Sequence, residues 1–250
     1  MINELLTVEE VAVFLRTTPN TIYRWLRSGK LPGVKLGKEW RIRKEVLDAK
    51  LAETTPMLKR QSLLDGIELK SNHMMAISSN EDDLLDLEAE FFKKGLALKQ
   101  RLFKGCWWQN TDDVRQELAA RGVPIEELEK NNLLTIIDLA KKYETSGVQG
   151  PIQVWRDEAT ITNQLGYSFL WASGSPGLES CGNFSNLIRF ESLLDDTLAK
   201  LNVVGICPYL YNDAGKNGLN EFIELMKCHR NVMFYNHDSF VYLKNNFADN

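Results

Sequence analysis

The pattern of apolar and polar positions divides this chain into a short N-terminal part and a longer C-terminal part. Between residues 7 and 51, apolar residues recur twice at helical spacing, then alternate with basic residues, and then recur at helical spacing once more. From residue 73 onward, short apolar runs alternate with longer amphipathic segments. Strands separated by helices predict a mainly parallel sheet that is covered by helices on both faces.

Two helices are predicted at the start of the N-terminal part. Thr7, with Glu10 three residues later, has the spacing of a capping box, and Thr18 followed by Pro19 is typical of the start of a second helix. In the first helix, one face carries the apolar residues Val8, Val11, Ala12, Phe14 and Leu15. In the second helix, Ile22, Trp25 and Leu26 are expected to pack inward.

A short hairpin is predicted after the second helix. Residues 34–36 and 40–42 alternate between apolar and basic side chains around a turn at 37–39, and residues 44–51 are expected to form a third helix. Leu36, Trp40 and Ile42 are expected to cover the helices. Helix, turn, helix, basic hairpin and helix together predict a winged helix-turn-helix that binds double-stranded DNA.

The candidate DNA-binding residues belong to the second helix and the hairpin, or wing. Polar groups on the helix are expected to reach base edges, and basic groups on the wing to contact phosphates. The alternative is a small helical domain whose basic residues are merely solvated. The candidates are Thr18, Asn20, Thr21, Tyr23, Arg24, Arg27, Lys30, Lys35, Lys38, Trp40, Arg41 and Arg43.

The N-terminal segments 6–12, 21–26, 29–32 and 40–44 resemble the excisionase-type, MerR-like DNA-binding domain, in the same order along the chain. Charge is distributed accordingly. Residues 1–60 hold 12 Lys and Arg against 7 Asp and Glu, a net of +5, whereas the other 190 residues carry a net of −9. A basic head on an acidic body is expected of a protein that contacts nucleic acid at one end only.

Sequence features also bear on location and redox state. No apolar run is long enough for a membrane span and no signal peptide is recognised, so a cytoplasmic protein without membrane association is expected. The four cysteines, Cys106, Cys181, Cys207 and Cys228, are widely separated and interpreted as buried thiols. Cys228 and His229 form a single adjacent pair. No paired spacing indicates a metal site, and no cofactor is expected.

The C-terminal part is expected to be a three-layer α/β domain. Strands are predicted at residues 73–77, 101–107, 133–138, 167–172, 203–209, 232–235 and 240–243, the last two as a hairpin edge. Helices are predicted at residues 81–98, 114–121, 157–166, 183–201 and 219–228. The phosphate-binding pattern G-x-x-x-x-G-K-[ST] is absent, and the loop 78–83 after the first strand is acidic and lacks glycine, which argues against ATP hydrolysis of the P-loop kind.

His73 and the segments 90–96, 186–191 and 205–209 resemble the MEDS sensory domain of methanogen and methylotroph, DcmR-type regulators. The resemblance covers residues 70–244 and implies a degenerate KaiC/RecA-like fold. Where members of that family tend to carry G-[ED]-M, this chain has 174–177 as Gly-Ser-Pro-Gly, which puts a pocket role of this loop in doubt. The domains are therefore expected at 1–52 and 72–250, with a linker or coupling helix at 53–71.

A ligand in such a sheet is expected outside the carboxyl ends of the strands. Tryptophans near strand ends would suit a small apolar compound that a few polar groups position. For each candidate the alternative is an ordinary core residue, and for Cys207 a further alternative is a thiol that reacts with or ligates a cofactor. The candidates are His73, Trp107, Trp108, Asp138, Trp171, Ser173, Glu191, Cys207 and Tyr209.

These observations predict a transcriptional regulator and not an enzyme. A small effector, expected to be a C1, methylated or halogenated hydrocarbon-type compound, would modulate operator binding, and one small head per operator half predicts a homodimer. Three alternatives stay open: a nucleotide-sensing regulator, an excisionase-like architectural DNA-binding protein, and a thiol enzyme using Cys207 or Cys181 that the head merely localises.

Overall fold

The computed structural model describes residues 5–47, 64, 67, 69, 73–214, 218–236 and 239–244. The chain divides into two compact units, Met1–Arg60 and Gln61–Asn250. Most of the segment 53–71, for which a linker or coupling helix is predicted, lies outside the described residues. Within it, Leu64 is fully buried in the core of the second unit, and the Lys94 ammonium donates to the carbonyl oxygens of Leu64 and Ile67.

The N-terminal unit contains the two helices and the hairpin that the sequence predicts. Its elements are β1 (Leu5–Leu6), α1 (Val8–Phe14), α2 (Pro19–Arg27), β2 (Val34–Leu36) and β3 (Glu39–Arg43). The three strands form an antiparallel sheet in the order β1-β3-β2, in which the short β1 is an addition to the prediction. Residues 44–47 are helical, and the remainder of the predicted third helix, 48–51, lies outside the described residues.

Local hydrogen bonds explain where α1 and α2 begin. Thr7 and Glu10 form the predicted capping box, with the Thr7 backbone N–H donating to Glu10 at 2.8 Å and the Glu10 N–H donating to the Thr7 hydroxyl at 3.1 Å. The Thr18 hydroxyl accepts from the backbone N–H of Thr21 at 3.3 Å, and Pro19 takes the first helical position. Both caps satisfy backbone donors that the first turn of a helix leaves unpaired.

Two residues predicted to lie in the core of the N-terminal unit are exposed instead. It comprises Val8, Val11, Ala12, Ile22, Leu26, Leu31, Ile42 and Leu47, with Leu15, Trp25 and Trp40 packed at its edge. Phe14 and Leu36 were expected to be buried, but they are 57% and 54% exposed. Phe14 is the last residue of α1, and Leu36 ends β2 beside the hairpin turn, so both lie at element ends away from the centre of the core.

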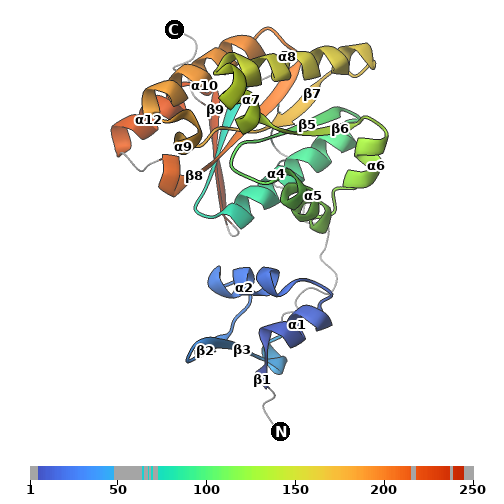
Figure 1. Cartoon of the computed structure of the whole chain (residues 1–250), viewed down its shortest axis with the longest axis vertical. Coiled ribbons are helices and arrows are strands. Elements are labelled where there is room, and N and C mark those ends of the chain that lie inside the picture. The colour runs from blue at the N-terminus through green and yellow to red at the C-terminus, as the bar shows by residue number, and fades with distance from the viewer. Residues whose placement is uncertain are drawn as a thin grey trace. The chain divides into compact units, whose positions relative to one another are not determined.

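The C-terminal unit is built on a seven-stranded sheet that is parallel except at one edge (Figure 1). The strand order is β10-β9-β4-β8-β7-β5-β6, and only β10 and β9 pair antiparallel. The strands are β4 (His73–Ser78), β5 (Arg101–Cys106), β6 (Leu134–Asp138), β7 (Leu170–Ser173), β8 (Val203–Leu210), β9 (Asn231–Asn236) and β10 (Ser239–Lys244). This arrangement confirms the predicted mainly parallel sheet with a hairpin edge.

Helices cover both faces of this sheet, so that two apolar cores form (Figure 1). One core lies under α4 (Glu81–Ala97), α5 (Thr111–Ala120) and α6 (Ile125–Lys130). The other lies under α7 (Leu139–Ser146), α8 (Gln149–Gln164), α10 (Phe184–Leu198) and α12 (Leu219–Lys227). Alternate residues of each strand enter opposite cores: Met75 belongs to the second core and Met74 to the first.

Four short helices are absent from the prediction, and one predicted helix begins too late. The additions are α6, α7, α9 (Leu178–Cys181) and α11 (Tyr211–Ala214), which are too short to show a clear helical period. Helix α8 begins eight positions before the predicted residue 157, because Gly150 and Pro151 fall in its first turn, where proline is tolerated. Trp155, expected to precede this helix, is therefore a fully buried residue within it.

None of the described helices combines the length and the apolar character that crossing a membrane requires.

Candidate functional site

Helix α2 presents a polar surface because its apolar residues are buried. Ile22 and Leu26 enter the core of the N-terminal unit, while Asn20 and Arg27 are exposed. The other predicted readers on the helix, Thr21, Tyr23 and Arg24, are half-buried, and Thr18 caps the helix through its hydroxyl. Lys30, just beyond the helix, is also half-buried. The helix thus carries donors of the kind that contact base edges and phosphates.

The wing adds a second basic surface on β2 and β3. Lys35, Lys38 and Arg43 are exposed, as phosphate contacts require. Arg41 differs, because its guanidinium pairs with the Glu39 carboxylate and donates to the Trp40 carbonyl oxygen at 3.0 Å. Trp40 itself is half-buried against the core. Of the basic side chains predicted on the wing, Arg41 is therefore the one already committed to neighbours within the hairpin.

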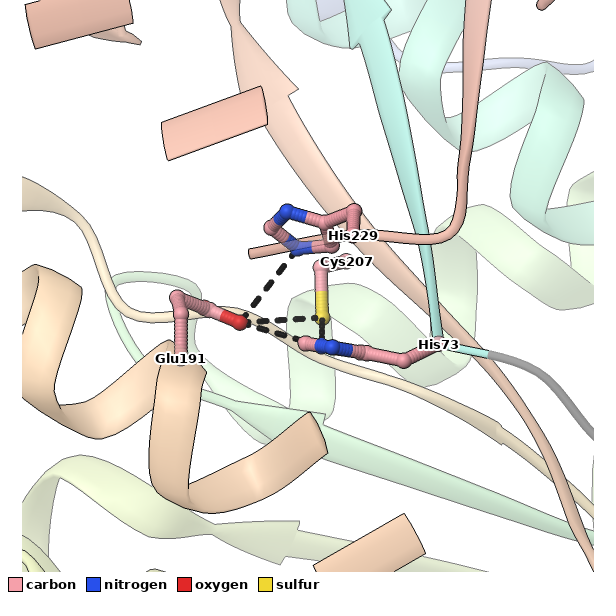
Figure 2. Close-up of side chains that lie close together, drawn as sticks. All are labelled: His73, Glu191, Cys207 and His229. Carbon is pink, nitrogen blue, oxygen red and sulfur yellow. Dashed lines mark hydrogen bonds and ion pairs between the residues drawn. The ribbon is translucent and has the colours of Figure 1, made fainter. Parts of the chain in front are cut away.

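A buried polar cluster lies in the C-terminal unit between the sheet and α10. Figure 2 shows His73 from β4, Glu191 from α10, Cys207 from β8 and His229 from just after α12, all pointing toward one another. Because Met75 pairs with Cys207 in the β4–β8 register, the side chains of His73 and Cys207 project from the same face of the sheet. All four residues are 1% exposed or less.

The contacts within this cluster centre on Glu191. Its Oε2 lies 3.0 Å from His73 Nε2, 3.3 Å from His229 Nε2 and 3.7 Å from Cys207 Sγ. His73 Nε2 is also 3.1 Å from Cys207 Sγ, and the two imidazole centroids are 4.3 Å apart. Tyr209 donates its hydroxyl to the other carboxylate oxygen, Oε1, at 2.5 Å. One nitrogen, sulfur or oxygen atom from each of the four residues lies within 4.8 Å of the other three.

Both histidines turn their second ring nitrogen toward backbone carbonyl oxygens. His73 Nδ1 is 3.2 Å from the Cys228 carbonyl oxygen and 3.5 Å from Asp195 Oδ1, and His229 Nδ1 is 2.9 Å from the Leu225 carbonyl oxygen. A carbonyl oxygen only accepts, so Nδ1 of each ring carries a proton. This fixes the orientation of both rings with Nε2 facing Glu191.

Burial and neighbouring charges set the protonation of the cluster. Burial alone would lower the pKa of His73, but Cys207, Asp195 and Glu191 raise it well above its usual value. Burial would raise the pKa of Glu191, but its close contacts with the imidazoles of His229 and His73 hold it well below its usual range. Burial, followed by Glu191, raises the pKa of Cys207 to about 12. At neutral pH, the protein alone therefore holds an ion pair between His73 and Glu191 beside a neutral thiol.

His229 has a different protonation state from His73, because burial and the neighbouring His73 lower its pKa. Tyr209 stays protonated, since burial and then Glu191 raise its pKa well above the usual value. Its hydroxyl is therefore a donor to the Glu191 carboxylate at any ordinary pH. The cluster contains one anion, one cation and neutral groups, which limits the cost of burying it.

The nine candidate ligand-binding residues do not surround a single pocket. His73, Glu191, Cys207 and Tyr209 come together in the cluster. Trp107 packs on Phe190 and Tyr143 in the same core, with ring centroids 5.1 Å and 5.7 Å apart. Trp171 and Ser173 face the opposite core: Trp171 packs on Phe91, and Ser173 donates to the buried Glu88 carboxylate.

The remaining two candidates lie at the surface. Asp138 caps α7 by accepting from the backbone N–H of Lys141 at 3.0 Å. Trp108 is 44% exposed and borders a surface hollow of about 220 Å³ together with Glu81, Leu85, Gln109, Asn110, Asp113, Val114 and Glu117. The expected ligand position at the carboxyl ends of the strands therefore does not coincide with the buried cluster, since His73 is the first residue of β4.

His229 is the member of the cluster that sequence reasoning missed. The sequence shows it only as the second half of the adjacent pair Cys228-His229, at the end of a predicted helix. In the cluster, His229 contacts Glu191, which is distant in the sequence. The side chain of the neighbouring Cys228 lies 3.6 Å from the Ser192 hydroxyl instead. No local signal in the sequence marks His229, because its partners Glu191 and His73 lie 38 and 156 positions away along the chain.

The loop between β4 and α4 offers no cradle for a phosphate. Asn80 caps α4 by accepting from the Asp83 backbone N–H at 2.9 Å, and Glu81, Asp82 and Asp83 fill the first turn. The Asp82 carboxylate pairs with Arg121, which also binds Asp86 at 2.8 Å. The helix N-terminus is thus occupied by carboxylates of the chain itself, which would repel a triphosphate.

Comparison with known families identifies the C-terminal unit. A family model described as "MEthanogen/methylotroph, DcmR Sensory domain", or MEDS, matches residues 72–230, which is more than half of the chain. The chain belongs to the MEDS family. A second model, described as a helix-turn-helix domain, matches residues 5–55 at the N-terminus of this MEDS protein. Both resemblances seen in the sequence are thereby confirmed.

Individual relatives add support for each unit. Two Mycobacterium tuberculosis proteins, from different strains and named for DNA binding, are each 44% identical over 39 residues. The matched segment covers 16% of the MEDS chain and only 50% of the length of each relative. A KaiC-like protein from Pyrococcus horikoshii has a similar structure, with a TM-score of 0.53 and 13% identity over 71% of this chain and 80% of that one. This likeness shows the fold alone and confirms the expected KaiC-like architecture.

Proposed function

We propose that this MEDS protein is a transcriptional regulator that binds operator DNA through its N-terminal unit and senses a small molecule through its MEDS domain. The observation that carries the proposal is the presence of a helix-turn-helix domain and a sensory domain in one chain. The net charge of +5 over residues 1–60, against −9 for the rest, supports DNA contact by the N-terminal unit alone.

The proposed effector is a C1, methylated or halogenated hydrocarbon-type compound. The observation that supports this class is the family description, which refers to methanogens and methylotrophs. The effector acts by binding the DNA-competent and DNA-incompetent conformations unequally, since only differential affinity shifts such an equilibrium. The N-terminal unit is small and buries little DNA surface, so specific DNA binding requires a homodimer on a two-part operator.

Structural observations weigh against two of the three rivals. Nucleotide sensing is disfavoured by the carboxylates at the start of α4. A thiol enzyme requires a nucleophilic thiolate, but burial raises the pKa of both Cys207 and Cys181 to about 12. The third rival, a purely architectural DNA-binding protein, does not account for the MEDS domain that follows the helix-turn-helix. We therefore infer that the protein is not an enzyme and that its C-terminal unit has a sensory role.

The test begins by selecting DNA sequences that the full chain retains from a random library. We expect a two-part motif to be enriched, and its affinity, measured by fluorescence anisotropy, to change about 5- to 150-fold with the right effector. Methylated amines, methanol, halomethanes, corrinoids and thiols are tested beside ATP, GTP and cyclic dinucleotides. If no motif is enriched, the proposal that the protein is a sequence-specific transcriptional regulator is wrong. A response to nucleotides alone supports the rival sensor and contradicts the proposed effector class.

Replacing Lys38 with Ala is expected to weaken binding to all DNA alike. Lys38 is exposed in the hairpin turn, where its ammonium can neutralise a phosphate without reading a base. The slope of log affinity against log salt should fall by about one unit. Lys130→Ala, at an exposed lysine of the MEDS domain, is the matched control and should leave both quantities unchanged. A Lys38→Ala protein that loses affinity only for the selected motif would contradict a phosphate contact.

Replacing Arg24 with Ala is expected to reduce discrimination between DNA sequences. Arg24 lies in the last turn of α2, the proposed recognition helix, and each base contact of this kind contributes about 1–3 kcal/mol of discrimination. Affinity for the selected motif should therefore fall much more than affinity for random DNA. Equal losses on both DNAs would show that Arg24 contacts the backbone and not a base.

A further inference from the structure

We propose that His73, Glu191, Cys207 and His229 form a binding site for a divalent transition-metal ion, with Zn²⁺ as the ion we would test first. The four residues are separated by as many as 156 positions in the sequence, so no ligand spacing is visible there. The fold gathers one donor atom from each into a single buried position (Figure 2). The proposal concerns the MEDS domain itself and stands whether or not the DNA-binding function is correct.

The distances in the cluster are close to those of a metal coordination sphere. A tetrahedral Zn²⁺ site has bonds of about 2.0–2.3 Å, which places its ligand atoms about 3.3–3.7 Å from one another. Here Glu191 Oε2 is 3.0 Å, 3.3 Å and 3.7 Å from the donor atoms of His73, His229 and Cys207. All four donors lie within 4.8 Å of one another, so a tetrahedral shell requires only small movements.

The outer partners of the ligands have the arrangement that metal sites use. Metal-bound histidines almost always donate their other ring N–H to a carbonyl or carboxylate, which orients the ring and fixes the tautomer. His73 does so toward the Cys228 carbonyl oxygen and His229 toward the Leu225 carbonyl oxygen, at 3.2 Å and 2.9 Å. The Tyr209 hydroxyl holds the non-ligating oxygen of Glu191 in the same manner. Each Nε2 lone pair is thereby directed at the proposed ion.

The chemistry of the donors selects the class of metal. Two imidazoles and a thiolate suit Zn²⁺, Co²⁺ or Fe²⁺, whereas Mg²⁺ and Ca²⁺ require oxygen ligands. On binding, the ion replaces the Nε2 proton of His73 and the Sγ proton of Cys207. One thiolate and one carboxylate then balance a charge of +2, and a neutral site is what complete burial favours. A monovalent ion would leave an unbalanced negative charge in the core.

The position of the cluster gives the ion a mechanical effect. His73 and Cys207 belong to β4 and β8, neighbouring strands at the centre of the sheet, while Glu191 belongs to α10 and His229 follows α12. A shared ion would tie both helices to the sheet. Binding energy for a preformed site adds to the folding stability of the domain, so the metal-loaded domain should resist unfolding better than the metal-free one.

The experiment compares full-length proteins after removal of metal with a chelator. We expect Zn²⁺ titration calorimetry to give one ion per chain, and Co²⁺ to give the thiolate charge-transfer band and intense visible bands of a tetrahedral site. Cys207→Ser should abolish the charge-transfer band and weaken Zn²⁺ binding at least tenfold. Cys106→Ser is the matched control, because Cys106 is equally buried but belongs to the opposite core, and it should bind as the unaltered protein does.

Two further measurements keep the outcome decisive if Cys207→Ser does not fold. The Co²⁺ spectrum of the unaltered protein is informative without any variant, and His229→Gln tests a ligand contributed from outside the sheet. Its binding should also fall at least tenfold while circular dichroism stays that of the folded protein. No bound Zn²⁺ or Co²⁺ in the unaltered protein, or Zn²⁺ binding by Cys207→Ser and His229→Gln equal to that of Cys106→Ser, overturns the proposal.

Discussion

Replacing Glu88 with Ala is expected to destabilise the MEDS domain by about 3–5 kcal/mol, because it leaves a buried lysine without its counterion. Lys104 of β5 is 1% exposed, and its ammonium lies 2.5 Å from Glu88 Oε1 on α4. The Ser173 hydroxyl of β7 donates to the same oxygen. Removing the carboxylate therefore disturbs three elements at once. Chemical denaturation followed by tryptophan fluorescence measures the loss, and the melting temperature should fall on the order of 10 °C.

Two controls separate charge from other effects of the substitution. Glu90→Ala on the same helix removes a carboxylate that pairs with Lys93 at 3.0 Å at the surface, and should cost at most about 1 kcal/mol. The double replacement Glu88→Leu with Lys104→Met removes both buried charges and should recover most of the stability. If this double variant is as unstable as Glu88→Ala, the unpaired charge is not the cause.

Replacing Gly174 with Ala is expected to cost about 2–4 kcal/mol through crowding of the backbone. A Cβ atom at this position would lie 2.5 Å from the Gly105 carbonyl oxygen and 3.1 Å from the Gly105 Cα atom. Backbone atoms of an interior strand cannot move aside as a flexible side chain can. The φ angle of +156° adds strain for any residue with a side chain. Thermal unfolding of the full chain provides the measurement.

Gly166→Ala is the matched control for Gly174. Its φ is also positive, at +85°, but nothing lies within 4 Å of an added Cβ atom. Only the backbone strain remains, so the loss should be about 1–2 kcal/mol. Equal losses at both positions would show that the approach to Gly105 is not tight in solution. The cost of a side chain at Gly174, just after β7, would then come from its backbone conformation alone.

Local signals were sufficient for most of the N-terminal unit. The capping box of Thr7 and Glu10, the Thr18 cap with Pro19, and the alternation in the hairpin are interactions between residues close in sequence, and each formed as predicted. Burial was less predictable. Phe14 and Leu36 fit the apolar pattern but lie at element ends, where the position of the core decides exposure.

The architecture of the C-terminal unit also followed from the pattern, because short apolar runs of strand length alternate with longer amphipathic segments. Strand boundaries were accurate to within a few residues, and the antiparallel edge of β9 and β10 was correctly predicted. Buried charges were not foreseen. Lys104 looks like a solvated residue in the sequence, and only the α4–β5 packing provides the carboxylate that makes its burial tolerable.

In the candidate site too, the sequence predicted some features and only the packing decided others. Residue type and position in a strand or helix placed His73, Glu191, Cys207 and Tyr209 among the nine candidates, and these four come together in the structure. Type and position were not enough to exclude Trp171 and Ser173, which face the other core, or to include His229. Which face a residue takes depends on strand register, and whether two distant residues meet depends on the order of strands in the sheet.

The sequence by itself determined the two-part organisation, the helix-turn-helix head and the sheet covered by helices, because caps, turns and hydrophobic periods act over a few residues. Only the tertiary structure decided that β4 and β8 are neighbours under α10, and hence that two histidines, a carboxylate and a thiol share one buried position. The physical reason is distance along the chain: contacts across more than a hundred residues arise from packing of whole elements, and no local propensity encodes them.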